Sequence, residues 1–243
     1  MDRYDKQFFE YIAEGAGSSA RVVVPLIMDW LMVNSVLDVG CGQGAWLAVW
    51  HKNGVDRVLG LDGDYVDRES LLIPADSFRP TNLNQTFELG RRFDLVTCLE
   101  VAEHLPPEHA ERLVKSLCVH ADQVLFSAAA PGQGGADHVN ERPYGYWKGL
   151  FARNGFEILD CVRPRIRDDE RVKPWYRYNT FLYVREAHVD ALPAQIRATT
   201  LGPDMDPPDI SPFWYKLRKE FVRRLPLRVV NRVAAMNERW TRL

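Results

Sequence analysis

Residues 36–44 of the chain read VLDVGCGQG. The apolar residues before the glycines predict a short buried β-strand over 35–39, and the apolar spacing after them predicts a helix over 45–53. Glycines at the carboxyl end of a strand allow a tight turn and let a ligand approach main-chain N–H groups closely. The stretch therefore predicts a strand, a ligand-binding turn and a helix, which is the first unit of an open α/β sheet.

The same alternation of strand and helix continues along the chain. Further strands are expected at 57–62, 77–80, 93–99, 122–130, 156–162 and 179–186. Further helices are expected at 106–120 and 144–154, and the glycine-rich stretch 131–143 is expected to be a loop. Because strands that alternate with helices form βαβ units, the pattern predicts a doubly wound, Rossmann-like α/β fold with a mostly parallel sheet.

Three regions differ in composition. Residues 1–34 predict a helical cap made of two helices, 3–14 and 20–33, separated by the breaker GAGSSA. Residues 35–188 hold the strand and helix pattern and form the predicted central domain. Residues 189–243 begin with a proline-rich linker and end in a basic segment with helical apolar spacing.

Composition limits the class of protein. Of 243 residues, 46% are hydrophobic and 26% are charged, which is typical of a globular protein. No run of about 18 apolar residues or secretory leader is visible, and the four cysteines form no closely spaced pair. These features predict reduced, buried thiols in a cytoplasmic protein.

Charge is distributed unevenly. Residues 211–243 hold nine Lys or Arg and two acids, so this segment carries +7, while the remainder carries −9 and the whole chain −2. An acidic body with a basic tail argues against a general nucleic-acid-binding protein. The apolar spacing over 213–240 suits packing on the domain, subunit association, contact with an anionic membrane surface, or nucleic-acid binding.

Asp62 ends the second strand about twenty residues after the first, where a carboxylate suits the hydroxyls of a ribose. With VLDVGCGQG, VLGLD and FDLVTCLEVAEHLP, residues 18–185 resemble the class I S-adenosylmethionine-dependent methyltransferases. The resemblance implies seven strands, the last antiparallel. It also implies a cofactor site in which Asp38, Gly40 and Gly42 hold the methionine part and Asp62 the ribose. Many members of the family have an acidic residue that binds the adenine amino group, and Asn82 stands at that position in this sequence. Cys41, Gly63 and Leu83 complete the predicted cofactor site.

A second group of polar residues follows the strand at 93–99. Glu100, Glu103 and His104 have the spacing of one face of a helical turn, and His138 lies in the loop expected at the same edge of the sheet. Two carboxylates and two imidazoles suit a divalent cation such as Mg²⁺ or Mn²⁺. The alternatives are that His104 or His138 acts as a plain general base, or that the group is structural.

Chemistry links this group to the acceptor. An alcohol has a pKa near that of water, so a cation that lowers it, together with a histidine base, favours an acceptor with adjacent hydroxyls: a sugar, a ribose or a quinol. ExxEH with a loop histidine resembles metal-dependent small-RNA 2′-O-methyltransferases, and quinone and sugar O-methyltransferases carry similar patterns.

Three aromatic residues, Tyr144, Tyr146 and Trp147, follow the glycine-rich loop and could face a sugar ring. Trp147 also fits the buried stripe of a helix. The stretch from the loop to these residues is similar to a subgroup of these enzymes encoded among glycan-biosynthesis genes. The basic segment 163–178 could be a lid over an anionic acceptor or solvated surface.

The sequence thus predicts an O-methyltransferase acting on a sugar or glycan precursor in polysaccharide biosynthesis. The alternatives are methylation of the 3′-terminal ribose of RNA, methylation of a quinol or natural product, and a binding protein with a degenerate methyltransferase fold. The predicted location is cytoplasmic, with a membrane surface as a further option.

Overall fold

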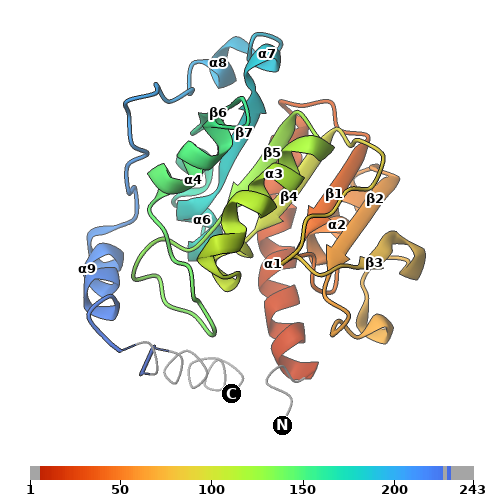
Figure 1. Ribbon diagram of the computed structural model, residues 1–243, viewed down its shortest axis with the longest axis horizontal. Coiled ribbons are helices and arrows are strands. Elements are labelled where there is room, and N and C mark those ends of the chain that lie inside the picture. The colour runs from red at the N-terminus through yellow and green to blue at the C-terminus, as the bar shows by residue number, and fades with distance from the viewer. Residues whose placement is uncertain (1–5, 227–228, 231–243) are drawn as a thin grey trace.

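One seven-stranded sheet forms the centre of the protein. The computed structural model describes residues 6–226 and 229–230. Its strands are β1 (Ser35–Val39), β2 (Arg57–Asp62), β3 (Phe78–Pro80), β4 (Leu95–Leu99), β5 (Gln123–Ser127), β6 (Phe156–Leu159) and β7 (Phe181–Arg185). They lie in the order β3-β2-β1-β4-β5-β7-β6 (Figure 1). The predicted α/β sheet is confirmed.

The direction of the strands fixes where a ligand can bind. The pairs among β3, β2, β1, β4 and β5 are parallel, whereas β7 is antiparallel to both β5 and β6. The chain order runs outward in opposite directions from β1 and β4. A crevice opens at the carboxyl ends of strands at such a point, which is where open α/β sheets bind ligands.

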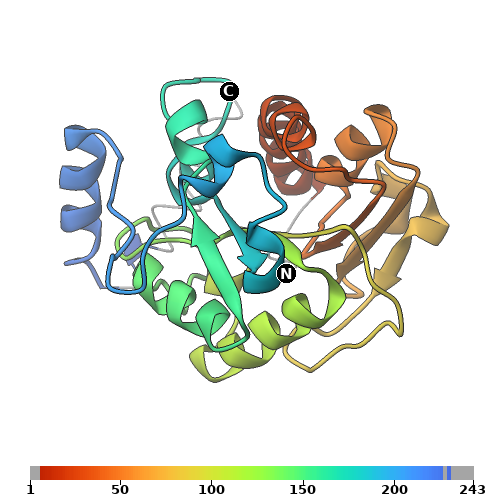
Figure 2. The same cartoon turned by 90° about the horizontal axis from the view of Figure 1, so that it is seen from above.

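Helices cover both faces of the sheet. The α-helices are α1 (Lys6–Met28), α2 (Ala45–Lys52), α3 (Ala110–His120), α4 (Tyr144–Ala152), α5 (Arg163–Ile166), α6 (Pro174–Asn179), α7 (Glu186–Val189), α8 (Ala194–Arg197) and α9 (Phe213–Val222). Short 3₁₀ turns are η1 (Arg68–Ser70), η2 (Ala75–Ser77), η3 (Ala102–His104) and η4 (Pro107–His109). Helices α1, α2, α5 and α6 contribute to the core on one face, and α3 and α4 to the core on the other (Figure 2). All four cysteines are buried and unpaired, as predicted.

The predicted break at GAGSSA is wrong, because α1 runs through it without interruption. The Ser19 hydroxyl donates a hydrogen bond to the Gly15 carbonyl at 2.8 Å and accepts one from the Lys173 amide at 3.0 Å. Ala16 and Ala20 are buried in the core. Small residues therefore let α1 pack closely against the segment before α6. The predicted start of the first helix, at residue 3, lies outside the described residues.

The basic segment 163–178 forms α5 and α6. Arg165, Arg167 and Arg171 are exposed, whereas Trp175 and Tyr176 line the cleft described below. Arg163 is fully buried. It donates two hydrogen bonds to the Asp160 carboxylate, at 2.8 and 2.6 Å, and two to the carbonyls of Tyr178 and Pro208, at 3.1 and 3.0 Å. This side chain joins three segments of the chain and does not contact the cleft described below.

Arg163→Leu is expected to lower the free energy of unfolding by about 3 kcal/mol, since it leaves a mostly buried Asp160 without its charge partner. Urea denaturation monitored by circular dichroism measures this. Arg167→Leu is the matched control, because Arg167 makes a surface ion pair of 3.5 Å with Asp168 and should cost less than about 1 kcal/mol. Equal losses in the two variants would contradict the structural role of Arg163.

The linker after β7 is held against the sheet. The Asp160 amide donates to the Thr199 carbonyl and the Leu201 amide to the Ile158 carbonyl, both at 3.0 Å. An isolated bridge pairs Leu159 with Thr200. These contacts fix the path of the chain toward α9, which lies at one end of the molecule (Figure 1).

Candidate active site

A cleft of about 1290 Å³ lies at the carboxyl ends of the parallel strands. All twelve residues that the sequence singled out for the cofactor, the cation or proton transfer line this cleft: Asp38, Gly40, Cys41, Gly42, Asp62, Gly63, Asn82, Leu83, Glu100, Glu103, His104 and His138. Their shared location follows from the fold, because each sits at or just beyond the end of a strand. Their individual roles stay predictions.

Asp62 connects two loops at one end of the cleft. One carboxylate oxygen accepts a hydrogen bond from the Gly42 amide at 2.7 Å. The other accepts from the Gly63 amide at 2.7 Å and from the Tyr65 hydroxyl at 2.5 Å. The amides of Gly40 and Cys41 donate to the carbonyl of Leu61. The glycine turn is therefore held firmly against the end of β2.

Asp38 supplies a buried carboxylate beside this turn. It accepts a hydrogen bond from the Thr97 hydroxyl at 2.6 Å. Burial raises the pKa of Asp38 to about 7, the Thr97 bond opposes the rise, and the nearby Asp62 adds to it. A cationic ligand group would favour the ionised form, so Asp38 suits the ammonium group of the methionine part of S-adenosylmethionine, and Asp62 stays predicted to bind the ribose.

Asn82 lies at the exposed rim of the cleft, after β3. Its side-chain oxygen accepts a hydrogen bond from the Asn84 amide at 3.0 Å. The preceding amide, of Thr81, donates to the Asp62 carbonyl at 2.7 Å. These bonds join the Asn82 loop to the end of β2 and place its amide group within the same cleft as Asp62.

Three potential metal ligands converge in the cleft, of which Glu103 is buried, His138 half-buried and His104 exposed. Glu103, His104 and His138 each offer one ligand atom, and these atoms lie within 4.8 Å of one another. Glu103 is fully buried; one carboxylate oxygen accepts from the Ala129 amide at 3.2 Å, and the other has no hydrogen-bond partner. Burial and the neighbouring Glu100 raise the pKa of Glu103. A divalent cation would satisfy the free oxygen and compensate the charge, so the residues fit such an ion.

The two histidines are prepared for this role in different ways. His138 Nδ1 lies 2.9 Å from a carboxylate oxygen of Glu141, and that carboxylate also accepts from the amides of Gly132 and Gly134 at 2.7 Å. A histidine that donates Nδ1–H to a carboxylate leaves Nε2 as its ligand or base. Desolvation of the ring by the surrounding protein, together with the neighbouring His138, lowers the pKa of His104 to about 4. His104 is therefore neutral at pH 7.

Glu100 does not join these three ligand atoms. The backbone of Glu100 is left-handed, with φ of 56°, and only Ala102–His104 forms a helical turn, so the spacing expected of a regular helix is not realised. Its carboxylate accepts hydrogen bonds from the side-chain amides of Gln133, at 2.6 Å, and Asn179, at 3.3 Å. A metal-ligand role for Glu100 stays a prediction, and its observed contacts are with the loop and with α6.

The three aromatic residues that follow the glycine-rich loop do not face the cleft, and Trp147 takes its alternative place in the buried stripe of a helix. Trp147 is buried against Phe126 in the core, and the Tyr144 hydroxyl donates to the Asn179 side chain at 2.9 Å. Neither they nor Tyr146 line the cleft. Its aromatic lining residues are Trp46, Tyr65, Trp175 and Tyr176, and the last two belong to the segment 163–178.

Two polar residues that sequence reasoning did not assign to the site also belong to it. Asn179 bonds both Glu100 and Gln133 and ends α6, just before β7. Because β7 is antiparallel, its amino end lies beside the carboxyl end of β5, and this rule could have located Asn179. Arg218, on α9, lines the cleft and donates to the Gln133 carbonyl at 2.8 Å.

A family model described as a methyltransferase domain matches residues 7–160. The chain belongs to this family. Among curated proteins, the ubiquinone biosynthesis O-methyltransferase of Pseudomonas fluorescens is 31% identical over 58% of this chain and 61% of its own length. The chain thus spans about three fifths of that relative.

Solved structures show the same fold. The magnesium protoporphyrin IX methyltransferase ChlM of Synechocystis, with bound S-adenosylmethionine, is 21% identical over 76% of this chain and 86% of that one, with a TM-score of 0.50. The sugar N-methyltransferase KedS8 of Streptoalloteichus is 18% identical over 71% and 87%, with a TM-score of 0.52. Across the described residues, no helix has the length and apolar character needed to span a bilayer.

Proposed function

We propose that this protein is an S-adenosylmethionine-dependent O-methyltransferase that acts on one of two adjacent hydroxyl groups with the help of a divalent cation. The observation that carries the proposal is one cleft that holds two chemically distinct groups of residues. Asp38 and Asp62 form one group, and the ligand atoms of Glu103, His104 and His138 converge to form the other. Family membership supports methyl transfer as the reaction.

The cofactor end is built to receive a positively charged molecule. Asp38 and Asp62 are buried carboxylates, and the turn between them exposes main-chain groups to the cleft. S-adenosylmethionine, when bound, supplies a sulfonium methyl group that a nucleophilic oxygen can attack. The glycine turn and both carboxylates bind and orient that molecule, and the buried walls formed by Trp46 and Leu99 keep water from the reacting groups.

The acceptor end must make an alcohol oxygen nucleophilic. Glu103, His104 and His138 would hold Mg²⁺ or Mn²⁺, which lowers the pKa of a bound hydroxyl. A histidine whose ring nitrogen is not held by the ion would accept the hydroxyl proton, and Glu141 keeps the His138 ring in position through its 2.9 Å hydrogen bond. An ion held by these three side chains would also take oxygens of the acceptor, which suits a vicinal diol better than a lone hydroxyl.

A sugar or glycan precursor is the first candidate acceptor. Polar groups of the 131–143 loop, including Gln133 and Asp137, line the cleft beside the cation ligands, and they suit the hydroxyls of a carbohydrate. A quinol is the second candidate, because the matched curated relatives act in ubiquinone biosynthesis and two adjacent ring hydroxyls present the same pair of oxygens. Trp175 and Tyr176 offer flat surfaces to either ring.

The test is methyl transfer from isotopically labelled S-adenosylmethionine to paired acceptors. Each pair has one member with two adjacent hydroxyls and one member lacking one of them: a nucleotide sugar and its deoxy analogue, and a catechol and its phenol. With Mn²⁺ present, transfer to the diol member is expected to be at least about 100-fold faster than to its partner, and EDTA should abolish it. Which diol reacts decides between sugar and quinol.

Two results would contradict the proposal. Equal rates for catechol and phenol in EDTA would indicate a metal-free enzyme with a simple histidine base. Failure to bind S-adenosylhomocysteine, together with no transfer to any acceptor, would favour a binding protein that retains the methyltransferase fold.

A further inference from the structure

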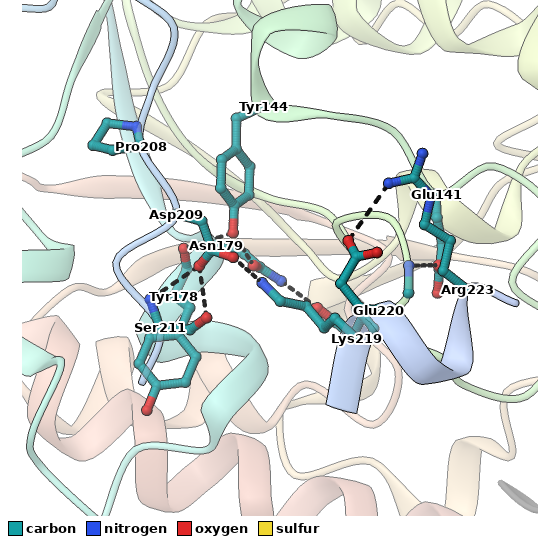
Figure 3. Close-up of polar contacts among 12 residues, drawn as sticks. Glu141, Tyr144, Tyr178, Asn179, Pro208, Asp209, Ser211, Lys219, Glu220 and Arg223 are labelled. Carbon is teal, nitrogen blue, oxygen red and sulfur yellow. Dashed lines mark hydrogen bonds and ion pairs between the residues drawn. The ribbon is translucent and has the colours of Figure 1, made fainter. Parts of the chain in front are cut away.

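Helix α9 docks on the protein through its charged side. Lys219 is buried, and its amino group lies 2.5 Å from the Asp209 carboxylate (Figure 3). The Ser211 amide and hydroxyl donate to the same carboxylate, at 2.9 and 2.6 Å. Arg218 donates to the Gln133 carbonyl at 2.8 Å. These bonds set the rotation of the helix about its axis.

The backbone contact under α9 is tight. A Cβ added at Gly132 would lie 2.2 Å from the Lys219 carbonyl oxygen, so the helix rests directly on the loop. Tyr215 contacts Tyr178 at 5.1 Å between ring centroids. Because the inward side of the helix is fixed at several points, its outward side is a defined surface of the folded protein.

Large apolar side chains occupy that outward side. The exposed fractions are 70% for Phe213, 76% for Trp214, 51% for Leu217 and 66% for Phe221. Phe213, Leu217 and Phe221 are four residues apart in sequence and therefore share one face of the helix. An apolar surface of this kind on a globular protein marks an interaction site.

Basic residues surround this apolar face. From 213 to 225 the chain has five Lys or Arg and one acid. Lys219 is neutralised inside the protein by Asp209, and Glu220 lies 3.6 Å from Arg223, whereas Lys216 and Arg224 are exposed. The remainder of the chain before residue 211 carries −9, so the positive charge is concentrated where the aromatic residues are exposed.

We propose that the outward face of α9 binds the surface of an anionic lipid bilayer. Aromatic and leucine side chains on one side of a helix insert at the boundary between headgroups and acyl chains, and flanking basic residues contact the lipid phosphates. The combination on α9 matches both requirements and places the rim of the cleft, which Arg218 lines, close to the membrane. The contact is peripheral and is independent of which acceptor the enzyme uses.

The experiment is flotation of the full-length protein with vesicles of phosphatidylcholine containing 40% phosphatidylglycerol, compared with pure phosphatidylcholine. The Leu217→Glu/Phe221→Glu variant is expected to reduce the fraction bound to anionic vesicles at least about tenfold, and 0.5 M salt should weaken wild-type binding. The matched control is Met32→Glu/Leu72→Glu, which places the same two charges at exposed apolar positions away from α9 and should bind like wild type.

Thermal unfolding and S-adenosylhomocysteine affinity, measured for each variant, verify that the fold is retained. The proposal is overturned if wild-type protein does not float with anionic vesicles, or if the α9 variant floats as well as the control. It is also overturned if the protein forms a concentration-dependent dimer in the absence of lipid that the α9 variant abolishes, since the face would then be a contact between two copies.

Discussion

His138→Ala is expected to reduce methyl transfer at least about a thousandfold while S-adenosylhomocysteine affinity stays within about twofold of wild type. His138 is one of three residues whose ligand atoms lie within 4.8 Å of one another. Its loss removes a cation ligand, or the proton acceptor in a metal-free reaction, and either of these supplies a large share of the rate for an alcohol acceptor. The cofactor carboxylates Asp38 and Asp62 are not among these ligands, so cofactor binding should be preserved.

Labelled S-adenosylmethionine measures the rate, and calorimetry measures Mn²⁺ binding to protein saturated with S-adenosylhomocysteine. Wild type should bind one ion, and His138→Ala should bind none in the same concentration range. His51→Ala is the matched control, because His51 is exposed on α2 and does not line the cleft. A fully active His138→Ala protein would contradict the proposed site.

Local patterns were sufficient for most of the fold. The strand Ser35–Val39 and the helix Ala45–Lys52, which is followed by the positive-φ Gly54, follow from short-range apolar spacing and from glycine. The stretch GAGSSA failed as a helix breaker because its small side chains pack against Lys173, more than 150 residues away. Glycine and serine are weak helix formers, so local propensity alone predicts that the helix stops at GAGSSA. The tertiary contact with Lys173 instead uses these small residues as a packing surface.

The site was predictable to the extent that it depends on parallel strands. Asp38 and Asp62 lie at the carboxyl ends of β1 and β2, and Glu103 follows the neighbouring β4, so the three meet in one cleft. Arg218 could not be placed in this way, because its position depends on a contact between Gln133 and a helix 85 residues further along the chain. Glu100 does not take the helical position expected for it, because its backbone is left-handed, and a left-handed conformation at a glutamate cannot be predicted from the sequence.

Gly40→Ala is expected to lower S-adenosylhomocysteine affinity at least about 100-fold and to destabilise the protein by about 3 kcal/mol. Gly40 has φ of 81°, which costs about 1–2 kcal/mol for alanine. A Cβ there would lie 2.3 Å and 2.8 Å from the two methyl carbons of Val101, which adds an overpacking cost of similar size. Since both residues line the cleft, moving them apart would displace the glycine turn from its cofactor-binding position.

Gly54→Ala separates the two causes. Gly54 has φ of 91°, but a Cβ there meets no atom within 4 Å. Gly54→Ala should therefore lose stability only through the unfavourable backbone conformation, and it should bind the cofactor normally. Adding Val101→Ala to Gly40→Ala removes the clashing methyl groups and should recover at least about tenfold in S-adenosylhomocysteine affinity, measured by calorimetry. If the double variant binds no better than Gly40→Ala, the clash with Val101 is not what disables the turn, and the close approach of a ligand to Gly40 itself becomes the better explanation.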